Sequence, residues 1–259
     1  WPLQARQEGP VSSPTPTDLE PSDENLPDPS SKLPDELAET LYQIETTVIE
    51  IRGLRLGNPV ERTLISSEEL RKIVVEDFFV DYSDEDARQD VAVLSLLGLL
   101  PDGFNLKSLY QDLYSEQIAG FYDDEIEEIY VVQGENFGGN EKLTYAHEFT
   151  HVLQDQVYDL SDGLGLNDEA CEEDSERCAA VQALIEGDAT KTELLWFQTH
   201  ATFEDYRDIQ KFYSDFSSPV LDSAPPYIAA DLGFPYEKGL AFIEHLYEQN
   251  GFTAVDDAY

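Results

Sequence analysis

Along most of the chain after residue 33, apolar residues recur every three or four positions, which is the spacing of a helix with one buried face. The first such stretch predicts a helix from Pro34 to about Ile51, with apolar residues at Leu37, Leu41, Ile44 and Val48. The same spacing predicts further helices over about 66–78, 84–99, 106–118, 141–157, 178–203 and 237–249. Residues 204–216 can continue the helical pattern, so the chain is expected to be mainly helical.

Three short segments have the aromatic and β-branched composition of strands. They run from Val60 to Ile65, from Gly120 to Tyr122 and from Glu128 to Val132. An acidic turn separates the last two, so we expect a hairpin just before the helix at 141–157. The expected fold class is α+β, mainly helical, with a small hairpin or sheet beside that helix. Loops are expected over 133–140, 158–177 and 217–235, the last because it is rich in Pro and Ser.

The first 32 residues differ from the rest because they are rich in Pro, Ser, Thr, Asp and Glu. Such a segment cannot bury enough apolar surface to order itself. We expect a disordered stalk over 1–32, between an N-terminal signal or anchor and the folded body, as exported proteins often have. Residues 33–259 are expected to form a single domain. Within it, 33–105 is a helical N-terminal part and 106–259 carries the candidate chemistry described below.

The chain is strongly acidic, and this excludes some kinds of partner. Asp and Glu outnumber Lys and Arg by 55 to 15, which gives a formal net charge of −40. Nucleic-acid binding depends on cationic side chains that neutralise phosphates, so we expect no nucleic-acid partner. Anionic membrane surfaces are unfavourable partners for the same reason. No apolar run approaches the roughly 18 residues of a membrane span, so no transmembrane segment is expected.

Cys171 and Cys178 are the two cysteines of the chain, and they lie seven residues apart in an acidic segment. They can close a small disulfide ring or remain two free thiols. We favour the disulfide, which would indicate an oxidising compartment. As zinc ligands they lack the C-x₂-C spacing and a nearby His.

Residues 147–151 read HEFTH, which is the H-E-x-x-H pattern. Residues four apart lie on the same face of a helix, so His147 and His151 can both direct a ring nitrogen at one ion. Glu148 is then close enough to reach a water on that ion without being a ligand, as in metalloproteases. The alternative is two solvent-facing histidines on an acidic helix. Two of the chain's four His fall in the motif, amid apolar residues at helical spacing, which favours the metal site.

A catalytic zinc site needs a third protein ligand and one open position. Val157 stands where a third His would be expected six residues after His151, which excludes that pattern. Glu186 is the favoured ligand because it follows small and apolar residues and precedes Gly187, where the missing side chain lets another backbone approach. A carboxylate buried there would need a partner such as Zn²⁺. Glu193, seven residues on along the same face, is the competing ligand.

The HEFTH motif, followed by Glu186-Gly187-Asp188-Ala189, resembles the gluzincin metallopeptidases. These are the thermolysin-like enzymes with a His, His, Glu zinc site, and the Glu-Gly form is similar to the peptidase MA-like families. The resemblance covers about residues 118–195. It implies a zincin-like catalytic domain with one Zn²⁺ per chain, in which Glu148 is the general base of peptide hydrolysis. The 34 residues between His151 and Glu186 exceed the thermolysin connection.

The resemblance also implies roles for residues around the zinc. The strand from Glu128 to Val132 would be an edge strand that pairs with the substrate backbone. Zinc-bound His residues usually donate their other ring N–H to a carboxylate or carbonyl, for which Asp188 is the first candidate and Asp155 the second. Gluzincins use a Tyr or His to stabilise the oxyanion. Tyr236 is favoured because it follows a Pro in the loop before the last helix, and the other candidates are Tyr227, His200 and His245.

The sequence therefore predicts an exported zinc metalloendopeptidase, outside the cell or at its surface, that hydrolyses a peptide or protein substrate. One alternative is a catalytically silent binding or surface protein that keeps the zincin fold. The presence of Glu148 argues against it, because this residue has no task in holding the metal. Another alternative is an acidic surface protein in which the motif occurs by chance and no metal binds.

Overall fold

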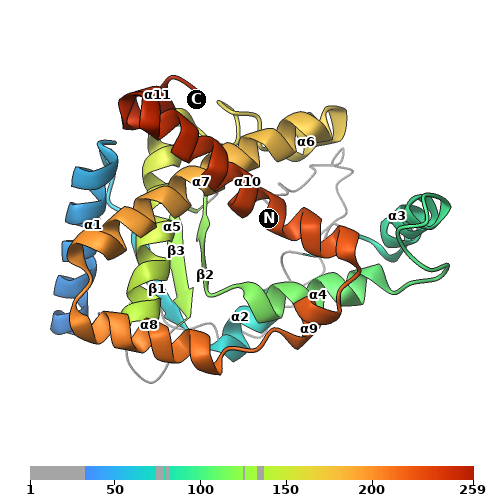
Figure 1. Cartoon of the computed structure of the whole chain (residues 1–259), viewed down its shortest axis with the longest axis horizontal. Coiled ribbons are helices and arrows are strands. Elements are labelled where there is room, and N and C mark those ends of the chain that lie inside the picture. Colours follow the sequence, from blue (N-terminus) through green and yellow to red (C-terminus); the bar gives the residue numbers. More distant parts are fainter. Residues whose placement is uncertain (1–32, 74–78, 80–81, 125, 133–136) are drawn as a thin grey trace, which may run out of the picture.

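Helix α5 (Gly139–Tyr158) packs beside α1 (Asp35–Arg52) and is crossed by α7 (Ser175–His200) (Figure 1). The computed structural model describes residues 33–73, 79, 82–124, 126–132 and 137–259. The apolar face of α5 includes Ala146, Phe149, Val152 and Leu153, which are fully buried. Fully burying a Val, Leu or Phe side chain contributes about 1.5–3 kcal/mol. This helix is therefore anchored firmly in the core.

A small sheet covers another side of α5 and has the strand order β1-β3-β2. Strand β1 (Glu61–Ile65) is parallel to β3 (Glu128–Val132), while β2 (Gly120–Asp123) is antiparallel to β3. The predicted hairpin and the mainly helical α+β class are confirmed. The prediction that Glu128–Val132 is an edge strand is wrong, because β1 pairs with its other side. In the described part of the sheet, β2 lies at one edge.

The remaining elements follow the predicted pattern over much of the chain. Helices α1, α3 (Asp84–Leu96), α4 (Leu106–Gln117) and α5 agree with it to within a few residues. Helix α2 (Ser67–Ile73) confirms the start of the helix predicted over 66–78. Residues 74–78 lie outside the described residues, as does the predicted stalk over 1–32. Helix α8 (Phe203–Asp215) is separate from α7 because Thr202 forms its capping box. No helix among the described residues combines the length and apolarity needed to cross a membrane.

Two segments predicted as loops contain helices. Helix α6 (Asp168–Glu173) lies within 158–177, and a disulfide joins its Cys171 to Cys178 of α7, which confirms the predicted pairing. The loop prediction for 217–235 is wrong, because α9 (Pro219–Ser223) and the first part of α10 (Pro226–Asn250) occupy it. A Pro in the first turn of a helix loses no hydrogen bond, which allows α10 to begin at Pro226. Helix α11 (Phe252–Asp256) follows.

Two glycines allow α7 and α10 to pack with their backbones in contact. A Cβ atom on Gly187 would lie 2.2 Å from the carbonyl carbon of Gly239. A Cβ atom on Gly239 would lie 2.0 Å from the carbonyl oxygen of Ala183. The close backbone approach expected at Gly187 is therefore present, and its partner is α10. Because Glu186 precedes Gly187, this crossing also fixes the position of Glu186.

Gly187→Ala is expected to lower the free energy of unfolding by about 1–3 kcal/mol or more, because the added methyl group overlaps the α10 backbone. Chemical denaturation of the two proteins would measure the difference. Gly233→Ala is the matched control, since a Cβ atom there meets nothing closer than 3.8 Å. That change should stabilise α10 by roughly 0.5–1 kcal/mol. Equal stability of Gly187→Ala and the wild type would contradict the packing argument.

Candidate metal centre

His147 and His151 lie one turn apart on α5 and face Glu186 on α7. The distance from Glu186 Oε2 is 3.1 Å to His147 Nε2 and 3.5 Å to His151 Nε2. The three ligand atoms all lie within 4.8 Å of one another. Glu186 is 4% exposed, and each His side chain is 12% exposed. This group could hold a metal ion.

Two of the three separations between these atoms suit a four-coordinate ion. Tetrahedral ligands about 2.0–2.1 Å from a metal are roughly 3.3–3.4 Å apart. The two His–Glu separations, 3.1 and 3.5 Å, fall on either side of that value. Three side chains also leave a fourth position for a water. The donor set of two imidazoles and one carboxylate therefore fits a metal ion at this point.

The Nε2 atoms of the two histidines face Glu186, and their other ring nitrogens, Nδ1, have separate hydrogen-bond partners. These Nδ1 atoms are called the outer nitrogens. His147 Nδ1 is 2.9 Å from Glu193 Oε2, and His151 Nδ1 is 2.8 Å from Gln154 Oε1. Since Oε1 of Gln154 and the Glu193 carboxylate accept hydrogen bonds, each imidazole is expected to keep its proton on Nδ1. Each Nε2 is then free to bind a metal. The competing ligand Glu193 thus lies beside the outer nitrogen of His147.

Asp188 and Asp155, the acceptors expected from the sequence, lie elsewhere. Asp188 Oδ2 is 3.1 Å from Gln154 Nε2, so Gln154 stands between this carboxylate and His151. Asp155 accepts hydrogen bonds from the Tyr122 hydroxyl, at 2.9 Å, and from the backbone of Leu160. The sequence reasoning missed Gln154. Its position three residues after His151, on the same helical face, was the signal that could have identified it.

Glu148 lies beside the two histidines and is 6% exposed. Burial, with added repulsion from Glu186 and Glu193, raises its pKa, against the attraction of the two imidazoles. A carboxyl group whose pKa is raised toward neutral is better suited to accept and return a proton. Gly120 of β2 faces this residue, since a Cβ atom there would lie 3.5 Å from Glu148 Cγ. The edge strand β2 therefore runs beside Glu148.

Tyr236 is the oxyanion candidate that lies beside the histidines. It is part of α10, not of a loop, and its ring centroid is 6.3 Å from that of His147. Burial, followed by repulsion from Glu186 and Glu148, raises its pKa well above the ordinary value. The phenol therefore stays protonated and can donate a hydrogen bond. The other three candidates, His200, His245 and Tyr227, are exposed.

A small cavity borders Glu148, His151 and Glu186. Its volume is about 30 Å³, which is room for one or two water molecules. Its other walls come from β2 and the turn after it, from the segment before α6 and from α7, and include Tyr122, Asp124, Leu160, Leu166, Gln182 and Ile185. The disulfide joins α6 to α7 beside these walls. Water can therefore be held next to the proposed general base.

Metal affinity at this centre is expected to increase with pH. Burial would lower the pKa of both imidazoles, but Glu193 and Glu186 outweigh it at His147, and Glu186 outweighs it at His151, so the pKa of each is raised above 6.5. A metal must displace those protons, so below the raised pKa values log K should increase by up to about two per pH unit. A competition titration with zinc from pH 6 to 9 would measure this slope. Affinity independent of pH would contradict it.

Comparisons of the chain with protein-family models, with curated proteins and with solved structures found no match.

Proposed function

We propose that this protein is a zinc metallopeptidase of the gluzincin type, with a zincin-like catalytic domain. The observation that carries the proposal is the convergence of His147, His151 and Glu186 on one point, with the buried Glu148 beside it. Glu148 is not needed to complete the ligand set, and a buried carboxylate is costly to keep. A role in proton transfer accounts for its presence. This favours an enzyme over a silent zinc-binding protein.

Zinc is the ion that this donor set favours. Catalytic zinc sites commonly have three protein ligands, and two His with one Glu is an established combination. Calcium and magnesium prefer oxygen ligands, so two imidazoles disfavour both of them. When bound, zinc would lower the pKa of a water toward about 7 and polarise the scissile carbonyl.

The residues of the chain would supply the remaining steps of hydrolysis. Glu148 would accept a proton from the attacking water and pass it to the leaving amine. Its raised pKa makes it a stronger base for the first of these transfers. The protonated hydroxyl of Tyr236 would donate a hydrogen bond to the developing oxyanion. Glu193 and Gln154 would hold the two histidines in orientation.

The proposed substrate is a peptide or protein segment in extended form. Strand β2 lies at an edge of the described sheet, and Gly120 on it faces Glu148. An extended peptide that adds to β2 by backbone hydrogen bonds would bring its scissile bond near the general base. The Cys171–Cys178 disulfide further supports an exported protein that works outside the cell or at its surface.

Hydrolysis of an unfolded protein substrate by the zinc-loaded chain would test this function. We expect cleavage at internal bonds, loss of cleavage after the metal is removed with a chelator, and recovery on addition of zinc. A chain that binds zinc tightly but cleaves neither unfolded proteins nor a peptide library would contradict the peptidase and favour the silent binding protein.

A further inference from the structure

Gln154 connects the candidate metal centre to a buried network on its far side. The residue is fully buried. Its Oε1 faces His151 Nδ1, and its Nε2 lies 3.1 Å from the carbonyl oxygen of Ile185, 3.1 Å from Asp188 Oδ2 and 2.9 Å from the Tyr259 hydroxyl. Both ends of this amide are therefore engaged by different groups.

The partners of the amide determine which way round it lies. An Asp carboxylate and a backbone carbonyl are acceptors, so they require the NH₂ end of Gln154. The Tyr259 hydroxyl donates its hydrogen to Asp188 Oδ2, at 2.8 Å, and can then only accept from Gln154. Turning the amide around would set its oxygen against these three acceptors in a buried site. The oxygen of Gln154 must therefore face His151.

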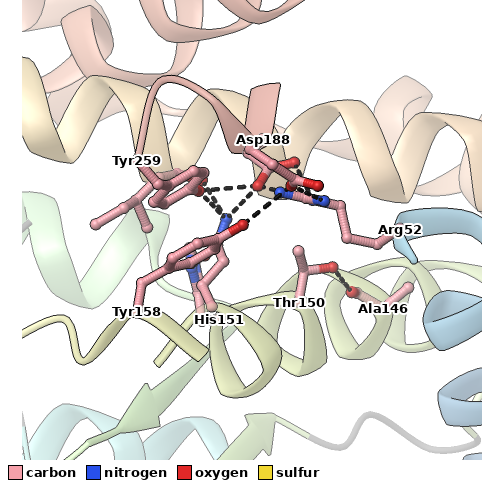
Figure 2. A network of polar contacts seen from close by, with 10 residues as sticks. Arg52, Ala146, Thr150, His151, Tyr158, Asp188 and Tyr259 are labelled. Carbon is pink, nitrogen blue, oxygen red and sulfur yellow. Dashed lines mark hydrogen bonds and ion pairs between the residues drawn. The ribbon is translucent and has the colours of Figure 1, made fainter. Parts of the chain in front are cut away.

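The carboxylate of Asp188 is itself held in place by Arg52 of α1. Both carboxylate oxygens accept from Arg52 Nε, at 2.8 and 2.9 Å, and neither side chain is exposed. Arg52 is held in turn by Asp256, whose Oδ1 is 2.7 Å from Nη1. Figure 2 shows Arg52 reaching Asp188 from one side while Tyr259 reaches it from the other. The orientation of the Asp188 carboxylate is thus fixed by residues that lie outside the metal centre.

We propose that Gln154 is a positioning residue which, oriented by Asp188 and Arg52, keeps the proton of His151 on Nδ1 and so makes Nε2 the metal-binding nitrogen. The amide of Gln154 does not ionise, so its ability to accept a hydrogen bond from His151 Nδ1 does not depend on its own protonation state. It also links the geometry of the metal centre to α1 and to Tyr259, which are far from it in sequence. The inference rests on the zinc site of the proposed function but not on peptide hydrolysis.

The dissociation constant for zinc, measured by competition with a chromogenic chelator, tests this role. Gln154→Leu keeps the size of the side chain and removes the acceptor, and we expect it to weaken zinc binding about 10–100-fold. Gln156→Leu is the matched control on the same helix, because Gln156 contacts Gly57 and Asn58 instead. It should leave zinc affinity unchanged. Equal affinities of Gln154→Leu and the wild type would overturn the inference.

Two further measurements separate positioning from a general loss of structure. The double variant Gln154→Glu with Asp188→Asn exchanges amide and carboxylate, so it restores an acceptor for His151 and keeps the net charge. We expect it to recover zinc affinity relative to Gln154→Leu. NMR of ¹⁵N-labelled, zinc-loaded wild type should show the His151 proton on Nδ1, and metal on Nδ1 would overturn the inference without any variant. Zinc binding without peptide hydrolysis would overturn only the proposed function.

Discussion

Glu148→Gln is expected to reduce the rate of peptide hydrolysis by at least about 10²–10⁴-fold while zinc remains bound. The substitution keeps the shape of the side chain and removes its ability to accept a proton. Because Glu148 does not belong to the group of converging ligand atoms, the three ligands stay in place. Loss of kcat with an unchanged zinc content therefore isolates the general base. Single-turnover cleavage of a fluorogenic peptide, beside a zinc determination, would measure both.

A second variant on the same helix serves as the control for this result. Glu141 lies in the first turn of α5, where its carboxylate accepts from the backbone N–H of Gly138. Glu141→Gln keeps an acceptor oxygen at that position and is expected to leave kcat unchanged. Hydrolysis at the wild-type rate by Glu148→Gln would contradict the assignment of the general base.

Glu186→Ala is expected to weaken zinc binding by more than about 100-fold, beyond the 10–100-fold range for residues outside the ligand set. The variant removes one of three ligand atoms and leaves the two imidazoles without the carboxylate that lies 3.1 and 3.5 Å from them. Isothermal titration, or competition with a chelator, would give the dissociation constants. Zinc should also raise the free energy of unfolding of the wild type, by about 2.7 kcal/mol when the free zinc concentration is 100 times the dissociation constant. The same zinc concentration should stabilise the variant far less.

Glu193→Ala is the matched comparison, since Glu193 lies on the same helix and contacts the outer nitrogen of His147. Its expected loss of zinc affinity is smaller, about 10–100-fold. If Glu193→Ala abolished binding and Glu186→Ala retained it, the third ligand would be Glu193 and the present assignment would be wrong.

Much of the candidate site could be predicted from the sequence because it depends on local spacing. The four-residue interval between His147 and His151 is enough to place both on one face of a helix. The Glu186-Gly187 pair identified the point on α7 where a buried acid lies beside a close helix crossing. These features need no knowledge of the rest of the chain.

The remainder depends on contacts between segments that are distant in sequence. Strand β3 is central because β1, more than 60 residues earlier, pairs with it. Helix α10 passes through Pro235, and the Pro-rich composition that suggested a loop concealed it. Asp188 was recognised as important, but its connection to His151 through Gln154 depends on where α7 crosses α5. Local patterns carry no information about such crossings.

The most direct test of the central claim is the metal content and coordination of the wild-type chain. After loading with zinc and removal of unbound metal, we expect about one zinc per chain. X-ray absorption should then show only nitrogen and oxygen ligands at roughly 2.0–2.2 Å. A chain that retains no zinc, or one with sulfur ligands near 2.3 Å, would contradict a centre built from His147, His151 and Glu186.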